Sequence, residues 1–438
     1  MPLGRIVAGL DVGTTKVTTI IAEVDESEAV SVIGVGQTES RGVERGMIVN
    51  LDETVDSIQK SVERAQHMAG CRIPSVYVGI GGEHIRGINS HAAVTVGKIT
   101  NEISEEDVKR VIDHAQNVSM PADMTVIHVI PQEYRVDDQK HIIQPIGLAG
   151  SRLEGEVHIV RGAATAEQNL RRAVQRAGLQ VAGIVIQPLA SALAVLSPDE
   201  QEWGVAMLDI GGGTTDIAVY HRRCIRHTAV LSIGSAYVTS DIAIGCSILM
   251  SEAEQLKKQY GRASRRLAEQ EHDLPEDPRE QPDIRFLREN TRAVLDAKIP
   301  EPKFSVELAR IIEMRMVELL GAAWFEIRKS GHQEYLASGV VVTGGGAMVK
   351  GAAELAQRVF GVPVRIGYPL GVGGIRESVA TPANATGVGL VLFGASQLLK
   401  TPQTMSMTDA EKELERLNQE MQRKPLEGMR RWLKEFFA

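Results

Sequence analysis

The 438-residue sequence predicts an α/β protein made of two related lobes, each with its own core sheet. Apolar stretches of strand length alternate with segments of helical periodicity along most of the chain. One pattern also occurs twice, near residues 11 and 209: an apolar strand, an Asp, a turn rich in Gly and Thr, and a second strand. The C-terminal residues add a short amphipathic helix behind a polar segment.

The first copy of this pattern begins with the apolar strand of residues 6–10 and ends in the strand VTTIIAEV. Glycine lets backbone N–H groups approach phosphate oxygens, threonine hydroxyls add donors, and lysine neutralises phosphate charge. The turn between the strands therefore predicts a phosphate-binding hairpin. Its residues are Asp11, Gly13, Thr14, Thr15 and Lys16.

The second copy follows the strand of residues 205–208. Its turn residues are Asp209, Gly211, Gly212, Gly213, Thr214 and Thr215. Any tight hairpin can use Gly and Thr, so one copy alone also has an ordinary structural explanation. Two copies favour two related halves that face one nucleotide. Asp11 and Asp209 each end a strand, and we expect the two carboxylates to hold a hydrated Mg²⁺.

A triple glycine after a buried strand is a third candidate contact for the nucleotide. Residues 340–343 (VVVT) read as the strand, and a helix-like segment follows the glycines. Such a turn often lies against a ligand, although it is also a common structural connection. The glycines are Gly344, Gly345 and Gly346.

The C-terminal segment predicts a membrane-surface helix on a flexible linker. Residues 399–424 are polar and hold no aromatic side chain, so we expect a linker there. Bulky apolar side chains on one helix face with cations off that face suit the boundary between lipid headgroups and acyl chains. The alternative is a helix that docks on its own domain, which the polar linker disfavours. The apolar stripe is Met429, Trp432, Leu433, Phe436 and Phe437, and the cations are Arg430, Arg431 and Lys434.

Composition narrows the class of protein. A net charge of −8 argues against a general nucleic-acid binder, which carries a basic surface. The three cysteines, at positions 71, 224 and 246, form no CxxC pair, which indicates a reducing compartment. No stretch resembles a signal peptide, and no apolar run approaches the length of a membrane span. We therefore expect a cytoplasmic protein with at most a surface attachment to the membrane.

The motifs together resemble those of a known superfamily. LDVGTTK, LDIGGGTTDI and VVVTGGGAMVKG are similar to the two phosphate motifs and the adenosine motif of the actin–Hsp70–sugar-kinase ATPases. Within that superfamily the chain most resembles the FtsA family of bacterial cell-division proteins. Residues 99–160 resemble the extra subdomain of that family, and the terminal helix resembles its membrane-targeting helix.

The resemblance implies an actin-like ATPase fold, with a ribonuclease-H-like core sheet in each lobe. The first lobe would take residues 1–85 and 164–202 with a returning segment 384–398, and the inserted subdomain residues 86–163. The second lobe would take residues 203–383, the linker 399–424 and the membrane helix 425–438.

The resemblance also assigns roles to single residues, with ATP and Mg²⁺ as cofactors. It places both hairpins on the phosphates and Gly344, Gly345 and Gly346 on the adenosine, together with Gly234 and Met348 as further nucleotide contacts. Glu254 and Lys257 match a helix that reaches the ribose and base, although their spacing alone also fits a solvated ion pair.

Gln187 falls where the superfamily carries the residue that orients the attacking water, so it joins Asp11 and Asp209 as a catalytic candidate. A neutral amide positions water but is a poor general base, which fits slow ATP hydrolysis or none. The alternative for Gln187 is a helix-cap contact.

The function implied by the resemblance is tethering of the tubulin-like division protein FtsZ to the cytoplasmic face of the inner membrane at the division septum. The chain would form actin-like filaments, and later division proteins would bind the inserted subdomain. The C-terminal peptide of FtsZ would contact residues 305–320, with Arg315 as the expected contact. A solvated helix charge is the alternative for Arg315.

Three other functions remain open from the residues: a sugar-kinase-like phosphotransferase, a chaperone ATPase and a rod-shape actin homologue.

Two departures from the family pattern also need attention. Ser235 follows Gly234 where the family commonly has a second glycine, so its bulk could affect the fit of the nucleotide. Residues 261–303 are charged, contain prolines and match the family poorly, which predicts a solvated excursion of unknown role.

Overall fold

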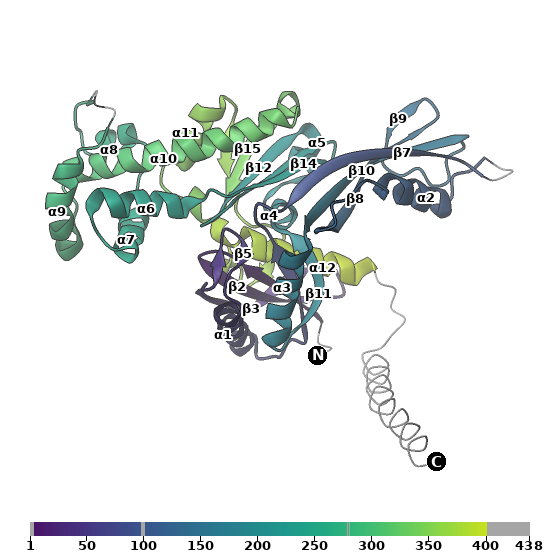
Figure 1. The fold of residues 1–438 in the computed structure, drawn as a ribbon, viewed down its shortest axis with the longest axis horizontal. Helices are drawn as coiled ribbons and strands as arrows, with labels where there is room; N and C mark the ends of the chain where they lie inside the picture. The colour runs from purple at the N-terminus through teal and green to yellow at the C-terminus, as the bar shows by residue number, and fades with distance from the viewer. Residues whose placement is uncertain (1–3, 98–100, 278, 280, 401–438) are drawn as a thin grey trace, which may run out of the picture. The chain divides into compact units, whose positions relative to one another are not determined.

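Two sheets with the same internal layout form the centre of the fold (Figure 1). The computed structural model describes residues 4–97, 101–277, 279 and 281–400. In each sheet an antiparallel meander of three strands is extended by parallel strands that pair beside its first strand. The elements that position the candidate site belong to one compact unit that ends at Ala395. The predicted α/β class with a core sheet in each lobe is confirmed.

The first sheet has the order β11-β6-β1-β2-β3-β17. Its strands are β1 (Arg5–Val12), β2 (Lys16–Val24), β3 (Val30–Glu39), β6 (Ser75–Ile80), β11 (Gln180–Ile186) and β17 (Gly373–Gly374). A small hairpin, β4 (Val43–Glu44) with β5 (Met47–Ile48), follows β3. The two central strands are buried on both faces, so β1 and β2 read as nearly continuous apolar runs in the sequence.

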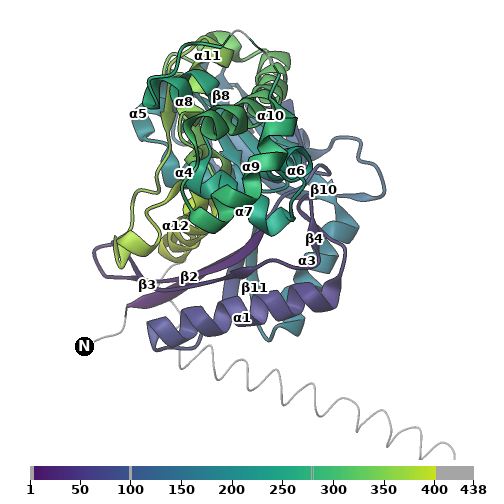
Figure 2. The ribbon, with the colours of Figure 1, turned by 90° about the vertical axis from the view of Figure 1, so that its left-hand side faces the viewer.

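Helices cover both faces of the first sheet, and Figure 2 shows α1 running beneath β2 and β3. One face packs against α1 (Leu51–Ala69) and α3 (Ala164–Arg176), and the other against α4 (Gln187–Val195) and α12 (Ala385–Lys400). The helix α1 begins at Asn50, whose side chain accepts from Glu53 N, and ends at Gly70, where φ is 68°. Val55, Ile58, Val62 and Ala65 follow helical spacing and form its buried face.

The second sheet has the order β14-β13-β12-β15-β16. Its strands are β12 (Val205–Ile210), β13 (Thr215–His221), β14 (Cys224–Leu231), β15 (Val340–Thr343) and β16 (Val364–Ile366). The helices of this half are α5 (Pro198–Trp203), α6 (Ser235–Cys246), α7 (Met250–Tyr260), α8 (Arg265–Glu271), α9 (Ile284–Ala297), α10 (Pro302–Lys329) and α11 (Ala352–Phe360). Short 3₁₀ turns of this half are η1 (Gln333–Tyr335), η2 (Gly345–Met348) and η4 (Pro382–Asn384), whereas η3 (Arg376–Ser378) lies beside β3 of the first sheet. Its core joins apolar side chains of β12 and β15 to those of α6, α10 and α11.

A third sheet lies between β6 and α3 in the chain. It has the order β7-β10-β8-β9 and one covering helix, α2 (Glu105–Gln116), whose apolar side chains pack against it. Its strands are β7 (Arg86–Thr95), β8 (Met124–Val136), β9 (Gln139–Ile142) and β10 (Arg152–Ala163). Buried polar contacts join this sheet to β14 of the second half. His158 Nε2 lies 2.9 Å from Thr228 Oγ1, and Asn89 Nδ2 donates to Arg226 O.

The prediction of a solvated excursion at residues 261–303 is wrong. The segment forms α8 and α9, and its Ala268, Leu287 and Val294 are buried. Leu287 and Val294 lie seven residues apart on one helix face, which packs into the second core while the charged side chains point outward. Arg310 of α10 is 1% exposed and pairs with Glu307, Asp277 and Glu269, so buried ion pairs also fix the segment.

Residues 401–438 lie outside the described part of the chain. The predicted linker and the predicted terminal helix, with Met429, Arg430, Arg431, Trp432, Leu433, Lys434, Phe436 and Phe437, therefore stay predictions. Among the helices that are described, none combines the length and the apolar character that crossing a membrane requires.

Candidate functional site: two glycine-rich hairpins and their neighbours

The two predicted phosphate hairpins contact each other. A Cβ added at Gly212 would lie 2.3 Å from Thr15 Cγ2, and one at Gly213 would lie 2.6 Å from Thr14 Oγ1. No side chain larger than hydrogen fits at either glycine, so the backbone of the second hairpin reaches the threonines of the first. Each hairpin closes the same way, because Gly13 N donates to Lys16 O and Gly211 N donates to Thr214 O.

Asp11 ends β1 and is buried beside Gln187, which begins α4. Gln187 Nε2 donates to Asp11 Oδ1 at 2.9 Å. Burial raises the pKa of Asp11 to about 6. The charge of Asp209 adds to this rise in pKa, while the charge of Lys16 and the hydrogen bond from Gln187 oppose it. The amide of Gln187 lies against Gly81, where an added Cβ would be 1.8 Å from Gln187 Oε1. The N-cap of α4 is Ile186, and Gln187 is the first residue of the helix, with its amide bonded to Asp11.

Asp209 ends β12 and is held by two hydroxyl groups. Ser191 Oγ donates to Asp209 Oδ2 at 2.6 Å, and Thr386 Oγ1 donates to the same oxygen at 3.1 Å. Burial raises the pKa of Asp209, and these two hydrogen bonds and Lys16 oppose the rise. The triple glycine lies beside this carboxylate, because a Cβ at Gly344, where φ is +85°, would lie 2.2 Å from Asp209 Oδ1.

Lys16 is the cation among these carboxylates. Its Nζ donates to Ala383 O at 2.6 Å and to Asn384 Oδ1 at 3.0 Å, both in η4. Burial lowers the pKa of Lys16, while the charges of Asp11 and Asp209 oppose that change. Since both carboxylates influence Lys16, the three side chains share one electrostatic environment.

The start of α6 seals the second hairpin. Ser235 N donates to Gly211 O and Ala236 N donates to Gly212 O, each at 2.9 Å. A Cβ at Gly234 would lie 2.4 Å from Gly212 O, so this position needs a glycine. Ser235 is 8% exposed and lies in the first turn of the helix. The effect of its side chain on the fit of the nucleotide stays a prediction.

Glu254 and Lys257 lie on α7, next to the start of α6. Lys257 is 7% exposed, and its Nζ lies 2.7 Å from Glu254 Oε2 and 3.2 Å from Ser235 O. The alternative of a solvated ion pair is therefore wrong for Lys257, which is buried at the edge of the hairpins. Burial tends to raise the pKa of Glu254, but Lys257, Thr239 and Lys258 hold it below its ordinary value.

Two of the predicted residues are exposed beside this cluster, and a third lies on another helix. Met348 and Gly345 belong to η2; the Met348 side chain is 55% exposed, and no atom lies within 4 Å of a Cβ added at Gly345. Arg315 lies on α10, where it forms a bidentate pair with Asp241 at 2.6 and 3.0 Å and also contacts Glu318 at 2.6 Å. Arg315 is thus an ion-paired side chain and not a solvated helix charge. Its contact with a partner protein stays a prediction.

Sequence reasoning missed several residues that complete the cluster. Thr386, Ala383 and Asn384 gave no signal, because they come from a segment far along the chain. Ser191 lies one helical turn after Gln187, and this i, i+4 spacing could have found it. Asp216 follows the second hairpin; it is 4% exposed, and its Oδ1 finds no hydrogen-bond partner among the described residues. Burial, then the charges of Asp209 and Asp11, raise the pKa of Asp216 well above its ordinary value.

The residues fit a triphosphate with a divalent cation. Glycine backbone and threonine hydroxyls face one another across the two hairpins, and two buried carboxylates carry raised pKa values that a cation would lower. Carboxylates of this kind suit Mg²⁺, which keeps water and phosphate oxygens among its ligands. Asp11 and Asp209 are therefore the side chains that would hold the metal.

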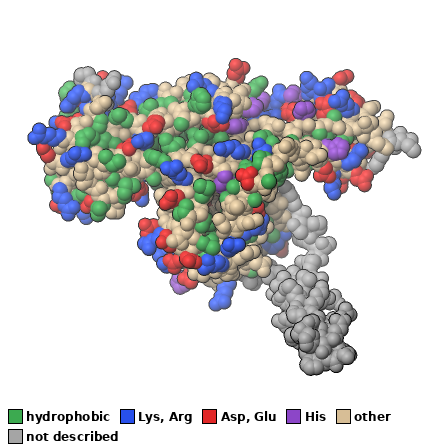
Figure 3. All heavy atoms as spheres, in the orientation of Figure 1, with side chains coloured by type: hydrophobic (Ala, Val, Ile, Leu, Met, Phe, Trp, Pro, Cys, Tyr) green, Lys and Arg blue, Asp and Glu red, His purple; other side chains and the backbone are tan. Residues whose placement is uncertain are grey.

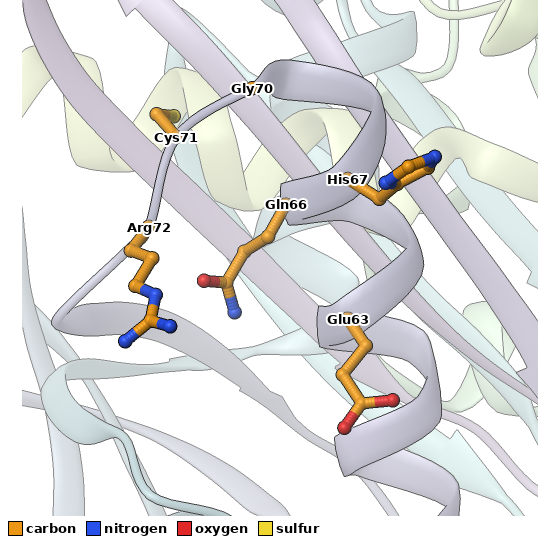
Figure 4. A pocket seen from close by; sticks show the side chains of 6 residues that line it. All are labelled: Glu63, Gln66, His67, Gly70, Cys71 and Arg72. Carbon is orange, nitrogen blue, oxygen red and sulfur yellow. The ribbon is translucent and has the colours of Figure 1, made fainter.

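A hollow elsewhere on the surface has different chemistry (Figure 4). It has a volume of about 320 Å³ and lies at the end of α1 and the loop that follows. None of the predicted site residues lines it, and its backbone lacks the facing glycines of the hairpins. Its lining residues are Glu63, Gln66, His67, Gly70, Cys71 and Arg72.

Comparison with known proteins identifies relatives along most of the chain. The model of the cell division protein FtsA family matches residues 206–389, and that of the SHS2 domain inserted in FtsA matches residues 82–161. The Cell division protein FtsA of Pseudomonas aeruginosa is 40% identical over 406 residues, which is 92% of each chain. The Escherichia coli K12 protein of that name is 37% identical over 392 residues, 89% of this chain and 90% of its own.

Among solved structures, the chain resembles one from the PilM–PilN type IV pilus biogenesis complex. The TM-score is 0.59 at 16% identity, and the match covers 89% of this chain and 98% of the other. At this identity the likeness concerns the fold, which is the actin-like α/β fold predicted from the motifs.

Proposed function

Since the chain belongs to the FtsA family of cell-division proteins, we propose that it binds Mg²⁺–ATP between its two hairpins and tethers FtsZ filaments to the membrane. The observation that supports nucleotide binding best is the contact between Gly212–Gly213 and Thr14–Thr15 beside two buried carboxylates. Hairpins that are distant in the sequence meet there, with the glycine backbone of one against the threonine side chains of the other.

The residues divide the work at this site by their chemistry. Bound Mg²⁺–ATP supplies a triphosphate whose charge the metal partly neutralises. Backbone N–H groups of both hairpins and Lys16 would bind phosphate oxygens, and Asp11 and Asp209 would coordinate the metal or accept hydrogen bonds from its waters. Gln187 orients a water molecule without removing its proton, since an amide is no base, so hydrolysis is slow or absent.

The nucleotide would favour contacts between copies in an actin-like filament, while α10 would bind the C-terminal peptide of FtsZ. Hydrophobic side chains gather on the surface over the end of the molecule that carries α6, α9 and α10 (Figure 3). Met314 and Val317, which flank Arg315 on α10, are 52% and 42% exposed. Apolar side chains beside an Arg suit a peptide with acidic and apolar residues.

The terminal stripe of Trp432 and Phe436 would bind the cytoplasmic membrane surface at the septum. Its cations, including Arg430, Arg431 and Lys434, would add attraction to anionic headgroups. One such helix binds reversibly, and several copies in a filament bind far more tightly through effective concentration. Later division proteins would bind the inserted subdomain.

Electron microscopy of the protein on lipid monolayers, with and without Mg²⁺–ATP, tests filament formation and membrane attachment together. We expect ordered filaments on the lipid only with the nucleotide. Co-sedimentation with anionic vesicles then separates the attachment step: Trp432→Glu with Phe436→Glu should abolish binding. Trp203→Glu is the matched control, because Trp203 is an exposed tryptophan of α5 (67%) that does not belong to the terminal stripe. Equal vesicle binding by the double variant and the parent would refute the anchor.

A further inference from the structure

The turn of the β4–β5 hairpin carries a residue that does not suit it. The two short strands pair as far as Glu44 and Met47, so Arg45 and Gly46 form a two-residue loop. Both loop residues have a positive φ, 49° at Arg45 and 78° at Gly46. Such a turn favours Asn or Gly at its first position, because the left-handed conformation is unfavourable for a long side chain. An arginine held there directs attention to the contacts of its side chain.

The tip of this hairpin is fixed to the first lobe beside the candidate phosphate site. Gly46 N donates to Thr14 Oγ1 at 3.2 Å. A Cβ added at Gly46 would lie 2.9 Å from Gly82 Cα, so the loop packs directly against the backbone of Gly82. The neighbouring Gly81 contacts the amide of Gln187. The hairpin tip is therefore in contact with the first phosphate hairpin and with the segment that carries Gly81.

The side chain of Arg45 reaches from this hairpin to the second lobe. Its guanidinium carbon Cζ lies 6.0 Å from the centre of the Tyr237 ring, in the first turn of α6. In the part of the chain that the structure describes, no carboxylate pairs with Arg45. The start of α6 is itself bonded to the second phosphate hairpin, through Ser235 N and Ala236 N. The contact between Arg45 and Tyr237 therefore joins the surroundings of one phosphate hairpin to those of the other.

A second arginine, Arg315 of α10, also lies over the Tyr237 ring. Its Cζ is 5.7 Å from the ring centre, and Asp241 holds its guanidinium in a bidentate pair. A guanidinium over the face of an aromatic ring is attracted by the π electrons and needs no carboxylate for this contact. Arg315 thus helps to fix the ring that Arg45 contacts from the other lobe.

We propose that Arg45 is a positioning residue whose contact with Tyr237 latches the two phosphate hairpins together across a bound nucleotide and so slows nucleotide release. Release requires the hairpins to separate, and separation breaks this contact. Arg45 acts through Tyr237 and through the hydrogen bond from Gly46 to Thr14, and it makes no contact with the phosphates. The inference rests on the proposed binding of Mg²⁺–ATP and adds to it the residues that retain the nucleotide.

The rate at which a fluorescent ATP analogue leaves the full chain, after mixing with excess unlabelled Mg²⁺–ATP, measures the latch. Arg45→Asn suits the turn better than arginine does, so this variant should unfold in urea at no lower concentration than the parent. It should nevertheless release the analogue about two- to fivefold faster, which is the expected loss for a guanidinium over a ring at an exposed site. Tyr237→Leu, which leaves the net charge unchanged, should show the same increase. The double variant should release the analogue no faster than either single variant, because both changes remove one contact.

Two further variants serve as controls. Arg41→Asn removes the same charge from an exposed arginine earlier in the chain, which pairs with Glu39 of its own lobe, and should not change the release rate. Tyr237→Phe keeps the aromatic ring and should restore slow release.

Faster release in only one of the two single variants would overturn the latch; if that variant is Arg45→Asn, the charge acts on the nucleotide directly. Increases that multiply in the double variant, or rates that equal the parent's in all variants, would overturn it too. In each of these cases the proposed binding of ATP stands. A folded parent that binds no nucleotide would overturn the proposed function, and the inference with it.

Discussion

The two hairpins have nearly the same sequence pattern but different surroundings. The first, ending at Lys16, brings its own cation, and its Asp11 accepts from the amide of Gln187. The second lacks a lysine, and its Asp209 accepts from the hydroxyls of Ser191 and Thr386. The helix α6 donates its first backbone N–H groups to the carbonyls of the second hairpin.

This difference indicates a division of tasks between two related halves. The first hairpin, with Asp11, lies beside the Gln187 amide, which can orient water, and carries Lys16, which can neutralise phosphate charge. The second hairpin, with Asp209, is instead contacted by the hydroxyls of Ser191 and Thr386, by the start of α6 and by Gly344. The duplicated motif thus gives the two hairpins similar backbone conformations, and the residues packed around each copy determine its chemistry.

The largest expected effect is on stability, from Asp11→Asn. Folding raises the pKa of Asp11 from 3.8 to about 6, so the folded chain binds this proton more tightly than the unfolded chain does. The ionised carboxylate therefore lowers the free energy of unfolding as pH rises from about 4 to 6, by about 3 kcal/mol in total. Asparagine avoids this cost, and the nucleotide-free variant should be more stable than the parent at pH 8 by about that amount.

Urea unfolding at pH 8 and at pH 4 measures the effect, which should shrink to below about 1 kcal/mol at pH 4, where folded Asp11 is uncharged and unfolded Asp11 is only partly ionised. Asp209→Asn provides the comparison between hairpins. We expect a smaller gain there, because two hydroxyl hydrogen bonds stabilise the charged form of Asp209. A stability difference that is independent of pH would contradict the explanation.

The next effect concerns nucleotide affinity. Asp209→Ala removes the acceptor of Ser191 and Thr386 and one of the two carboxylates offered to the metal. The affinity for Mg²⁺–ATP should fall about fiftyfold. Titration with fluorescent ATP measures this, with Asp199→Ala in the exposed first turn of α5 as the control. Unchanged affinity in the Asp209 variant would remove the second hairpin from the metal site.

The smallest expected effect tests the amide beside the first hairpin. Alanine at position 81 would place a Cβ 1.8 Å from Gln187 Oε1, so the amide or the backbone must move. Gly81→Ala should lower the free energy of unfolding by about 1–2 kcal/mol and slow any ATP turnover while ATP still binds. Thermal unfolding and phosphate release measure the two effects. Gly321→Ala, at an exposed position inside α10 where no atom lies within 4 Å of the new Cβ, should raise the free energy of unfolding by about 1 kcal/mol and leave ATP turnover unchanged.

Local pattern was enough to predict a large part of the fold and site. The hairpins, the glycine turn at Gly344 and the two related sheets follow from apolar periodicity and turn residues, which act over a few positions. Residues 261–303 show where this reasoning failed. Their many charges indicated solvation, yet Leu287 and Val294 were the decisive residues, and buried ion pairs with Arg310 compensate part of the charge.

The chain's own order of residues determines where each hairpin forms, because strands and tight turns depend on neighbours in the sequence. The order of residues does not determine which side chains contact each aspartate in the folded protein. Thr386 reaches Asp209, Asn384 reaches Lys16, and Thr239 joins Glu254 to Lys257 only after distant segments pack together. Burial and hydrogen-bond partners set the charge of a carboxylate, and both are properties of the packed chain, so the chemistry of the site was decided in three dimensions.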